Sequence, residues 1–186
     1  MLAGGLPRDT AVLLPGWPAN LAAFQAGWWA VVLAAAAGMP LAGMAVVAAV
    51  LGWHLLRVRP HGGEAVLIGL TALAGLAFES LLQATGWVAF AGGGPASWLA
   101  PLWMAALWAN FATTLNVSLR PLRGRPWLAA GLGAVGGPAA YWGGAELGAM
   151  TFHHPAAGLI ALALAWAVLT PLLLALAARL ARSARP

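Results

Sequence analysis

The stretch "NLAAFQAGWWAVVLAAAAGMPLAGMAVVAAVLGWHLLR", residues 20–57, contains two long apolar runs that are separated by Gly-Met-Pro and end at an arginine. Each run approaches the ~20 residues that a helix needs to cross the hydrocarbon core of a membrane. The runs are continuous and rich in Ala, Val and Leu, whereas the strands of a membrane barrel alternate apolar with polar residues. The stretch therefore predicts two antiparallel transmembrane helices joined by a tight connection.

The rest of the chain continues this composition. Of the 186 residues, 62% are hydrophobic and only 7% are charged, whereas a soluble domain carries about 25% charged residues. We therefore expect an all-α, polytopic membrane protein, with a six-helix transmembrane domain over residues 20–180. The expected spans are residues 20–38, 40–57, 64–86, 97–118, 127–148 and 155–179. Residues 1–19 are expected to be interfacial or disordered, and residues 181–186 to form a short basic tail. The chain has no cysteine, which excludes disulfides.

The arginines predict the orientation of the chain. All nine basic residues are arginines, and they occur only in the two tails, in connections 2–3 and 4–5, and at the end of the last span. Because basic residues are retained on the cytoplasmic side, both termini are expected in the cytoplasm, with six membrane crossings between them. The arginines expected to set topology and contact lipid headgroups are Arg57, Arg59, Arg120, Arg123, Arg125 and Arg179. They separate apolar runs instead of forming a stripe, which argues against nucleic acid as a partner.

Small residues recur along the first and fifth spans. The first carries Ala22, Ala26, Ala30, Ala34 and Gly38; the fifth carries Gly136, Ala140, Gly144 and Gly148, with Gly133 and Gly137 on the adjoining face. Small residues at this spacing allow two helix backbones to approach closely. They indicate either packing within the bundle or a docking face for another membrane protein. The first span is the better candidate for docking.

Tryptophan is the most frequent aromatic residue. Trp53, Trp87, Trp98, Trp127 and Trp142 lie near predicted span boundaries, as in an aromatic belt. Trp28, Trp29, Trp103, Trp108 and Trp166 lie deeper and are interpreted as packing residues.

Glu79 is the clearest functional candidate, because it lies inside the third span. Ionisable groups at such depth are costly and often functional. Gln83 follows one turn later on the same face. Apolar surroundings favour a neutral, hydrogen-bonded carboxyl at this position. Glu79 is expected to act as a proton carrier, an acid or base, or a ligand anchor, or else to tie two helices together.

Further polar residues approach the outer surface, namely Tyr141, Glu146, His153 and His154. With Glu79 and Gln83 they predict an outward-facing polar cavity. Adjacent histidines point apart, and no metal-binding helix spacing is present. The serines lack a nucleophile-elbow context. We therefore assign neither a metal site nor a catalytic residue, and the sequence does not indicate which cofactor, if any, the protein uses.

The fourth span ends in "LWANFATTLNVSLRPLRGRP", residues 107–126. Thr113 and Thr114 are expected to bond helix carbonyls or neighbouring helices. Asn110 and Asn116 are candidates for ligand binding. Gln25 and His54 reach a similar depth in the first and second spans, so these groups are expected to converge on a cytoplasmic-side polar pocket.

Four segments together resemble a family of uncharacterised bacterial multi-pass inner-membrane proteins that share a domain of unknown function: "FQAGWWAVVLAAAAGMP", "FESLL", "LWANFATTLNVSLRPLRGRP" and "GAVGGPAAYWGGAELGAMTF". The resemblance covers roughly residues 20–180. In the family a histidine often follows the asparagine that corresponds to Asn116, whereas this chain has Val117 there. Members are often encoded near lipid-modifying enzymes, so the resemblance implies a link to membrane lipids and no particular activity.

Three functions are compatible with these observations. The first is binding or transport of a small or lipidic molecule. The second is an accessory or structural subunit of a membrane complex, in which the helix faces matter more than any pocket. The third is a lipid-modifying membrane enzyme that uses Glu79 as an acid or base. We place binding or transport first and expect the lipid bilayer, and another membrane protein, as partners.

Overall fold

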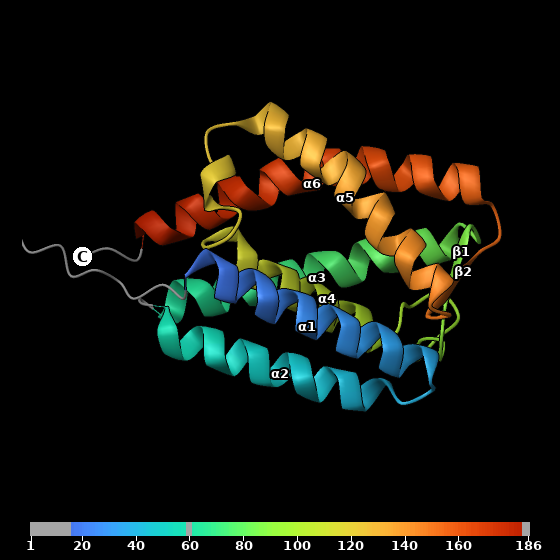
Figure 1. Ribbon diagram of the computed structural model, residues 1–186. Helices are drawn as coiled ribbons and strands as arrows, with labels where there is room; N and C mark the ends of the chain where they lie inside the picture. The colour runs from blue at the N-terminus through green and yellow to red at the C-terminus, as the bar shows by residue number, and fades with distance from the viewer. Residues whose placement is uncertain (1–15, 59–60, 184–186) are drawn as a thin grey trace, which may run out of the picture.

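The computed structural model describes residues 16–58 and 61–183, which form an all-α bundle of six helices (Figure 1). The helices are α1 (Trp17–Ala36), α2 (Pro40–Arg57), α3 (His61–Ala84), α4 (Leu102–Leu115), α5 (Pro126–Glu146) and α6 (Pro155–Ser183). Consecutive helices run in opposite directions along the bundle. The predicted fold class is confirmed.

Four of these helices, α1, α2, α3 and α6, are long and apolar enough to cross a membrane. The glycine-rich α5 has 21 residues. Helix α4 has only 14 residues, which at 1.5 Å per residue makes it about 21 Å long. It is shorter than the expected span 97–118 because its first turn begins after Pro101, and because the chain before it enters the bundle without helical structure, with Ala100 fully buried.

Both ends of the described chain extend further into helix than expected. Helix α1 begins at Trp17, with Pro18 in its first turn, where a proline is readily accommodated. Residues 17–19 therefore belong to the bundle, whereas residues 1–15 of the expected N-terminal segment lie outside the described part. Helix α6 continues to Ser183, beyond the expected end of the last span.

Helix α4 lies at the centre of the bundle and contacts α1, α2, α3 and α6. Most of its residues are buried, including Trp103, Trp108 and Leu115. The other close pairs are the hairpins α1–α2 and α5–α6, and α5 contacts chiefly its own partner. Figure 1 shows these two hairpins on opposite sides of the bundle. The α5–α6 hairpin is therefore separated from α1 along much of its length.

Two short strands pair in the connections, outside the apolar runs that were expected to be helical. Strand β1 (Val88–Phe90) follows α3, strand β2 (Met150–Phe152) precedes α6, and the two run antiparallel with Ala89 opposite Thr151. Both connections leave the bundle at the same end, where their backbone groups satisfy one another. We call this the strand end of the molecule.

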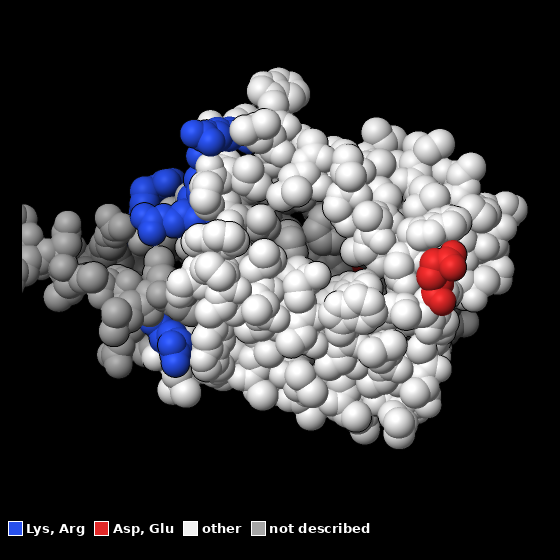
Figure 2. Space-filling view, in the orientation of Figure 1, with Lys and Arg blue, Asp and Glu red and all other residues white. Residues whose placement is uncertain are grey.

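The described arginines gather at the opposite end, which we call the arginine end (Figure 2). They lie at the end of α2, in the connection that contains the 3-10 helix η1 (Arg120–Leu122), and in the last turns of α6. The described acidic surface lies at the strand end, where α5 ends at Glu146. This one-sided distribution agrees with the alternation from which the cytoplasmic orientation was predicted.

Candidate functional site

A cavity of about 400 Å³ lies between the two hairpins and is visible as a hollow between α1 and α5 (Figure 2). This volume is within the range of small-molecule sites. The walls come from α1, α4, α5 and α6, and the residues are mostly apolar. The principal wall residues are Phe24, Trp28, Leu107, Trp108, Phe111, Tyr141, Trp166 and Thr170.

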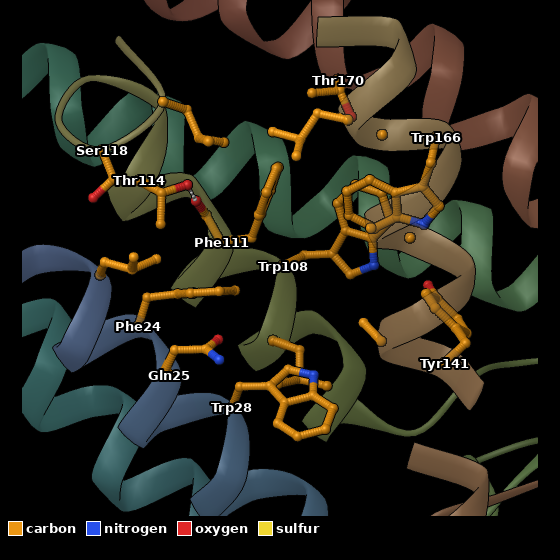
Figure 3. Close-up of a pocket in the computed structure, with 18 of the residues that line it drawn as sticks. Phe24, Gln25, Trp28, Trp108, Phe111, Thr114, Ser118, Tyr141, Trp166 and Thr170 are labelled. Carbon is orange, nitrogen blue, oxygen red and sulfur yellow. Dashed lines mark hydrogen bonds between the residues drawn. The ribbon is translucent and has the colours of Figure 1, made fainter. Parts of the chain in front are cut away.

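The aromatic wall residues are packed against one another in a fixed arrangement (Figure 3). The rings of Trp108 and Trp166 stack, with centroids 4.8 Å apart and planes 20° from parallel. Phe111 meets Trp166 edge-on at 5.1 Å, and Phe24 meets Phe111 edge-on at 6.3 Å. Offset-stacked and edge-to-face pairs are the favoured geometries for aromatic rings. These contacts hold the aromatic rings of the wall against one another.

Glu79 lies behind this wall, fully buried. Its Oε1 accepts a hydrogen bond from Trp108 Nε1 at 2.8 Å and a second from the Tyr141 hydroxyl. Glu79 comes from α3, Trp108 from α4 and Tyr141 from α5, so one oxygen atom joins three helices. With Trp166 of α6 beside them, four helices contribute to this group, which we call the Glu79 cluster.

Glycines bring the rings of the Glu79 cluster into place. A Cβ added at Gly75 of α3 would lie 2.5 Å from Cδ1 of Trp108, and one at Gly137 of α5 would lie 2.5 Å from Cδ1 of Trp166. Non-bonded carbon atoms normally stay about 3.5–4.0 Å apart. Each indole ring therefore occupies space that any other residue would fill.

Three buried polar atoms, two on the cavity lining and one behind it, have no hydrogen-bond partner among the described residues. They are Glu79 Oε2, Trp166 Nε1 and Thr170 Oγ1. Trp166 and Thr170 both line the cavity. Figure 3 shows the Trp166 nitrogen, the Trp108 nitrogen and the Tyr141 hydroxyl directed toward the same region. Buried polar groups are nearly always paired in folded proteins, so Trp166 and Thr170 are the polar positions at which a molecule in this otherwise apolar cavity could form hydrogen bonds.

A second polar cluster is buried toward the arginine end. Glu64 Oε2 lies 3.2 Å from His54 Nε2, and Glu64 Oε1 accepts a hydrogen bond from Asn116 Nδ2. Arg123 stands nearby in the α4–α5 connection. Burial lowers the pKa of Arg123, the charge of Arg120 lowers it further, and the carboxyl of Glu64 opposes this shift. The cluster joins α2, α3 and α4 and does not line the cavity.

A family model described as a protein of unknown function, DUF2878, matches residues 17–172. The chain belongs to the DUF2878 family. The match contains the cavity, the Glu79 cluster and the second polar cluster, and it confirms the resemblance to an uncharacterised family. Neither the curated proteins nor the solved structures include a significant match.

The DUF2878 chain brings together only some of the residues singled out from its sequence. Glu79 and Tyr141, which were expected near one another, share a hydrogen bond. Gln83 instead donates to the carbonyls of Ser97 and Leu99, at 2.9 and 3.2 Å, and so holds the chain before α4.

The remaining outer residues stay apart from this pair. Glu146, His153 and His154 are exposed at the strand end and line no part of the cavity. The expected outward-facing polar cavity is therefore not formed. Within the described ranges, no three His, Asp or Glu side chains lie close enough together to hold a metal ion.

The residues expected on the cytoplasmic side divide into separate contacts. Asn116 and His54 do converge, through Glu64, whereas Asn110 donates to the Phe24 carbonyl at 2.9 Å and fastens α4 to α1. Gln25 is exposed at the cavity mouth.

The threonines of α4 bond to carbonyls within their own helix. Thr113 donates to the carbonyl of Asn110 and Thr114 to that of Phe111, each at 2.7 Å. Both act as helix-stabilising groups, as expected for threonine in an apolar helix.

Two features of this DUF2878 member were missed from its sequence. Glu64 was treated only as the start of a span, although His54 near the end of α2 and Glu64 near the start of α3 flank one short connection. Their positions on either side of a short connection could have predicted that the two side chains interact. The second feature is the placement of Trp108 and Trp166 at the cavity, since both were interpreted as packing residues.

The small-residue faces have uses inside the bundle. A Cβ added at Gly133 would collide with the Trp166 backbone, so this face of α5 packs on α6. Gly136 and Ala140 line the cavity. On α1, the backbone at Val31 lies 2.5 Å from where a Cβ of Gly43 would stand, so α1 packs closely on α2. Docking of another membrane protein on these faces stays a prediction.

Proposed function

We propose that this membrane protein binds a lipophilic molecule that enters its cavity sideways from the bilayer, between α1 and α5. The observation that carries the proposal is the apolar, aromatic-walled cavity that opens on a lateral face of the bundle. Lateral surfaces of a membrane-spanning bundle face lipid tails, so the ligand need not pass through water. Transport would follow if the bound molecule leaves toward the other membrane surface.

The arrangement of the two hairpins supports this route. Because α5 packs chiefly on α6, no other described helix closes the gap between α5 and α1. The mouth carries apolar residues such as Leu21 and Leu132. On the α5 side, Gly136 and Ala140 have small side chains that leave the entrance open. A flexible apolar chain or a flat ring system fits such an entrance better than a charged solute, which would lose its hydration in this cavity.

We further propose that the bundle resides in a bacterial inner membrane with its arginine end toward the cytoplasm. Both ends of the described chain lie near the arginine end in Figure 1. The support is the concentration of described arginines there, since positive residues are retained on the cytoplasmic side. The same residues would contact anionic headgroups at that surface.

A pair of glycine variants tests ligand binding. A Cβ at Gly136 meets no atom within 4 Å, yet Gly136 lines the cavity, so Gly136→Leu fills the cavity without a backbone clash. Gly131→Leu is the matched control, because Gly131 lies on the same helix, is equally open and is outside the cavity lining. Each protein is extracted gently and its retained molecules are identified by native mass spectrometry.

We expect the wild type and Gly131→Leu to retain the same apolar molecule and Gly136→Leu to lose it. If Gly136→Leu retains that molecule at the wild-type level, the cavity is not its binding site. If the wild type retains only bulk lipids in the proportions of the membrane, the proposal loses its support.

A further inference from the structure

We propose that the arginine end carries a binding site for a phosphate monoester, centred on the guanidinium group of Arg123 and flanked by Arg120 and Arg182. Arg123 does not line the cavity. The site therefore goes beyond the proposed function and does not depend on it. The starting observation is a guanidinium group that is partly enclosed by the protein and has two nitrogen atoms without a partner among the described residues.

The position of Arg123 leaves strong hydrogen-bond donors unused. Its Nε and Nη2 are buried and have no hydrogen-bond partner among the described residues. These two nitrogens form the edge through which arginine makes two parallel hydrogen bonds to a phosphate or a carboxylate. The side chain as a whole is only half-buried, in the connection between α4 and α5. The guanidinium group therefore lies between the protein interior and the aqueous surface, where an anion can approach it.

The neighbouring carboxyl of Glu64 does not supply the missing partner. Burial lowers the pKa of Arg123, and the charge of Glu64 opposes this shift only in part. The two oxygens of Glu64 already contact His54 and Asn116, and no ion pair among the described residues includes Arg123. The two other described carboxyls lie behind the cavity wall and at the strand end. Within the described chain, Arg123 thus remains a cation without an anionic partner.

Two further arginines stand close enough for their charges to act on Arg123. Arg120 lies in η1, on the same connection, and Arg182 lies in the last turn of α6. Both are exposed, so their charged ends can turn toward a ligand. A phosphate monoester carries about −1.5 to −2 charges at pH 7 and offers three acceptor oxygens. It suits a group of three arginines better than a phosphodiester or a carboxylate, which has less charge and fewer unsubstituted oxygens.

The connection holds Arg123 in a defined place. The backbone N–H of Arg123 donates to the carbonyl of Arg120 at 3.1 Å, and that of Arg125 donates to the carbonyl of Leu122 at 3.0 Å. Gly124 lies between them with φ +75°, a conformation that other residues rarely adopt. Because the turn is already formed, binding need not order the chain, and this lowers the cost of holding a ligand.

Three lipids with the same acyl chains test the headgroup preference. Phosphatidic acid carries a phosphate monoester, phosphatidylglycerol carries a diester, and diacylglycerol carries no phosphate. The full-length protein in detergent micelles is given an equimolar mixture, and native mass spectrometry measures how much of each lipid is bound. In a second series glycerol 3-phosphate competes with phosphatidic acid, because it carries the same monoester without acyl chains and so distinguishes a soluble phosphate from a lipid headgroup.

For the wild type we expect bound phosphatidic acid to exceed phosphatidylglycerol severalfold, and diacylglycerol to bind least. Arg123→Gln should lower the bound phosphatidic acid about tenfold or more, because hydrogen bonds between charged groups are lost. Arg123→Lys keeps the charge but not the two-nitrogen edge, and should lower it severalfold.

Two variants serve as controls. Arg57→Gln removes the same charge from the same end of the molecule, but Arg57 is exposed and its guanidinium lies over the ring of Trp53, 5.1 Å from the centroid. It should lower the bound phosphatidic acid by less than about twofold, because exposed charges contribute little. Gly136→Leu fills the cavity and should leave phosphatidic acid bound at the wild-type level. If Arg123→Gln does not fold, the lipid preference of the wild type and Arg123→Lys still decide the question.

The outcomes separate this site from general attraction and from the cavity. An equal loss in Arg123→Gln and Arg57→Gln would show that the whole arginine end attracts anions, and would overturn the site. Equal binding of phosphatidic acid and phosphatidylglycerol to the wild type would overturn the choice of a monoester. Loss of phosphatidic acid in Gly136→Leu but not in Arg123→Gln would place the lipid in the cavity, which overturns the site and supports the proposed function.

The competition identifies the source of the phosphate. Displacement of phosphatidic acid by an equal concentration of glycerol 3-phosphate would support the site and assign it to a soluble phosphate monoester. Retention of phosphatidic acid in the wild type, together with its loss in Arg123→Gln, would support a lipid headgroup as the ligand.

Discussion

The close approach of α3 to α4 at Gly75 leads to a quantitative prediction for Gly75→Ala. The new Cβ would lie 2.5 Å from Cδ1 of Trp108 and closer still to Cγ. Because carbon atoms in contact stay about 3.5–4.0 Å apart, the indole ring must move by about 1 Å or more. It cannot do so independently, since it is stacked on Trp166 and bonded to Glu79.

Two costs and one gain determine the size of the effect. Overpacking a filled interior costs about 1–3 kcal/mol, and weakening the hydrogen bond to the carboxyl adds about 1 kcal/mol or more. Alanine is favoured over glycine in a helix by about 1 kcal/mol, which offsets part of this loss. We therefore expect Gly75→Ala to destabilise the protein by about 2 kcal/mol, or by about 4–8 °C in melting temperature for a chain of this size.

The assay is thermal unfolding in detergent micelles, followed by intrinsic tryptophan fluorescence. Gly69→Ala is the control, because Gly69 lies in the same helix and a Cβ there meets no atom within 4 Å. Helix propensity alone should leave that variant at or above the wild-type melting temperature. A Gly75→Ala protein that melts with the Gly69→Ala control would refute the packing of Trp108 against α3.

Three further predictions concern single contacts and the orientation of the bundle. Tyr141→Phe removes a donor from the buried carboxyl and should lower the free energy of unfolding by about 1–3 kcal/mol, measured by the same melting assay. His54→Phe leaves Glu64 with one partner fewer and should cost a similar amount, about 1–3 kcal/mol. Because the chain lacks cysteine, single cysteines can report topology: in spheroplasts, an impermeant maleimide should label Glu146→Cys directly and Ser183→Cys only after permeabilisation.

Neighbouring residues provide the controls for these variants. Trp142→Phe is the control for Tyr141→Phe, and His153→Phe is the control for His54→Phe. Both controls alter exposed side chains, and each should change the free energy of unfolding by less than about 0.5 kcal/mol. Destabilisation by these controls equal to that of the buried variants would show that the hydrogen bonds are not the cause. Labelling of both cysteines from the same side would contradict the predicted topology.

The helical fold was predictable because its signals are local. Continuous apolar runs and the alternation of arginines determine the number of helices and their order without reference to tertiary structure. The short α4 was not predictable in this way. The chain before it is held by distant groups, as when Ala100 N donates to Ser80 Oγ at 3.1 Å and Gln83 binds two loop carbonyls. Such contacts exist only after the helices have packed.

The candidate site was predictable only in part for a related reason. Glu79 stood out because a carboxyl in an apolar helix is costly wherever it points. Trp108 and Trp166 gave no comparable signal, since helices that are apolar on every face carry no periodicity that indicates which face lies inward. Their place at the cavity depends on how α4 and α6 rotate against Gly75 and Gly137, which the sequence pattern does not encode.

The joining of several helices at one carboxyl also has a consequence for biogenesis. During synthesis α3 enters the membrane with Glu79 before α4 supplies Trp108, and Tyr141 arrives only with α5. A nascent chain that has not yet inserted α5 therefore presents a carboxyl with an incomplete set of donors to lipid. Arrival of the last hairpin supplies the missing donor, so we expect the hydrogen bonds of Glu79 to be complete only after α5 and α6 have inserted.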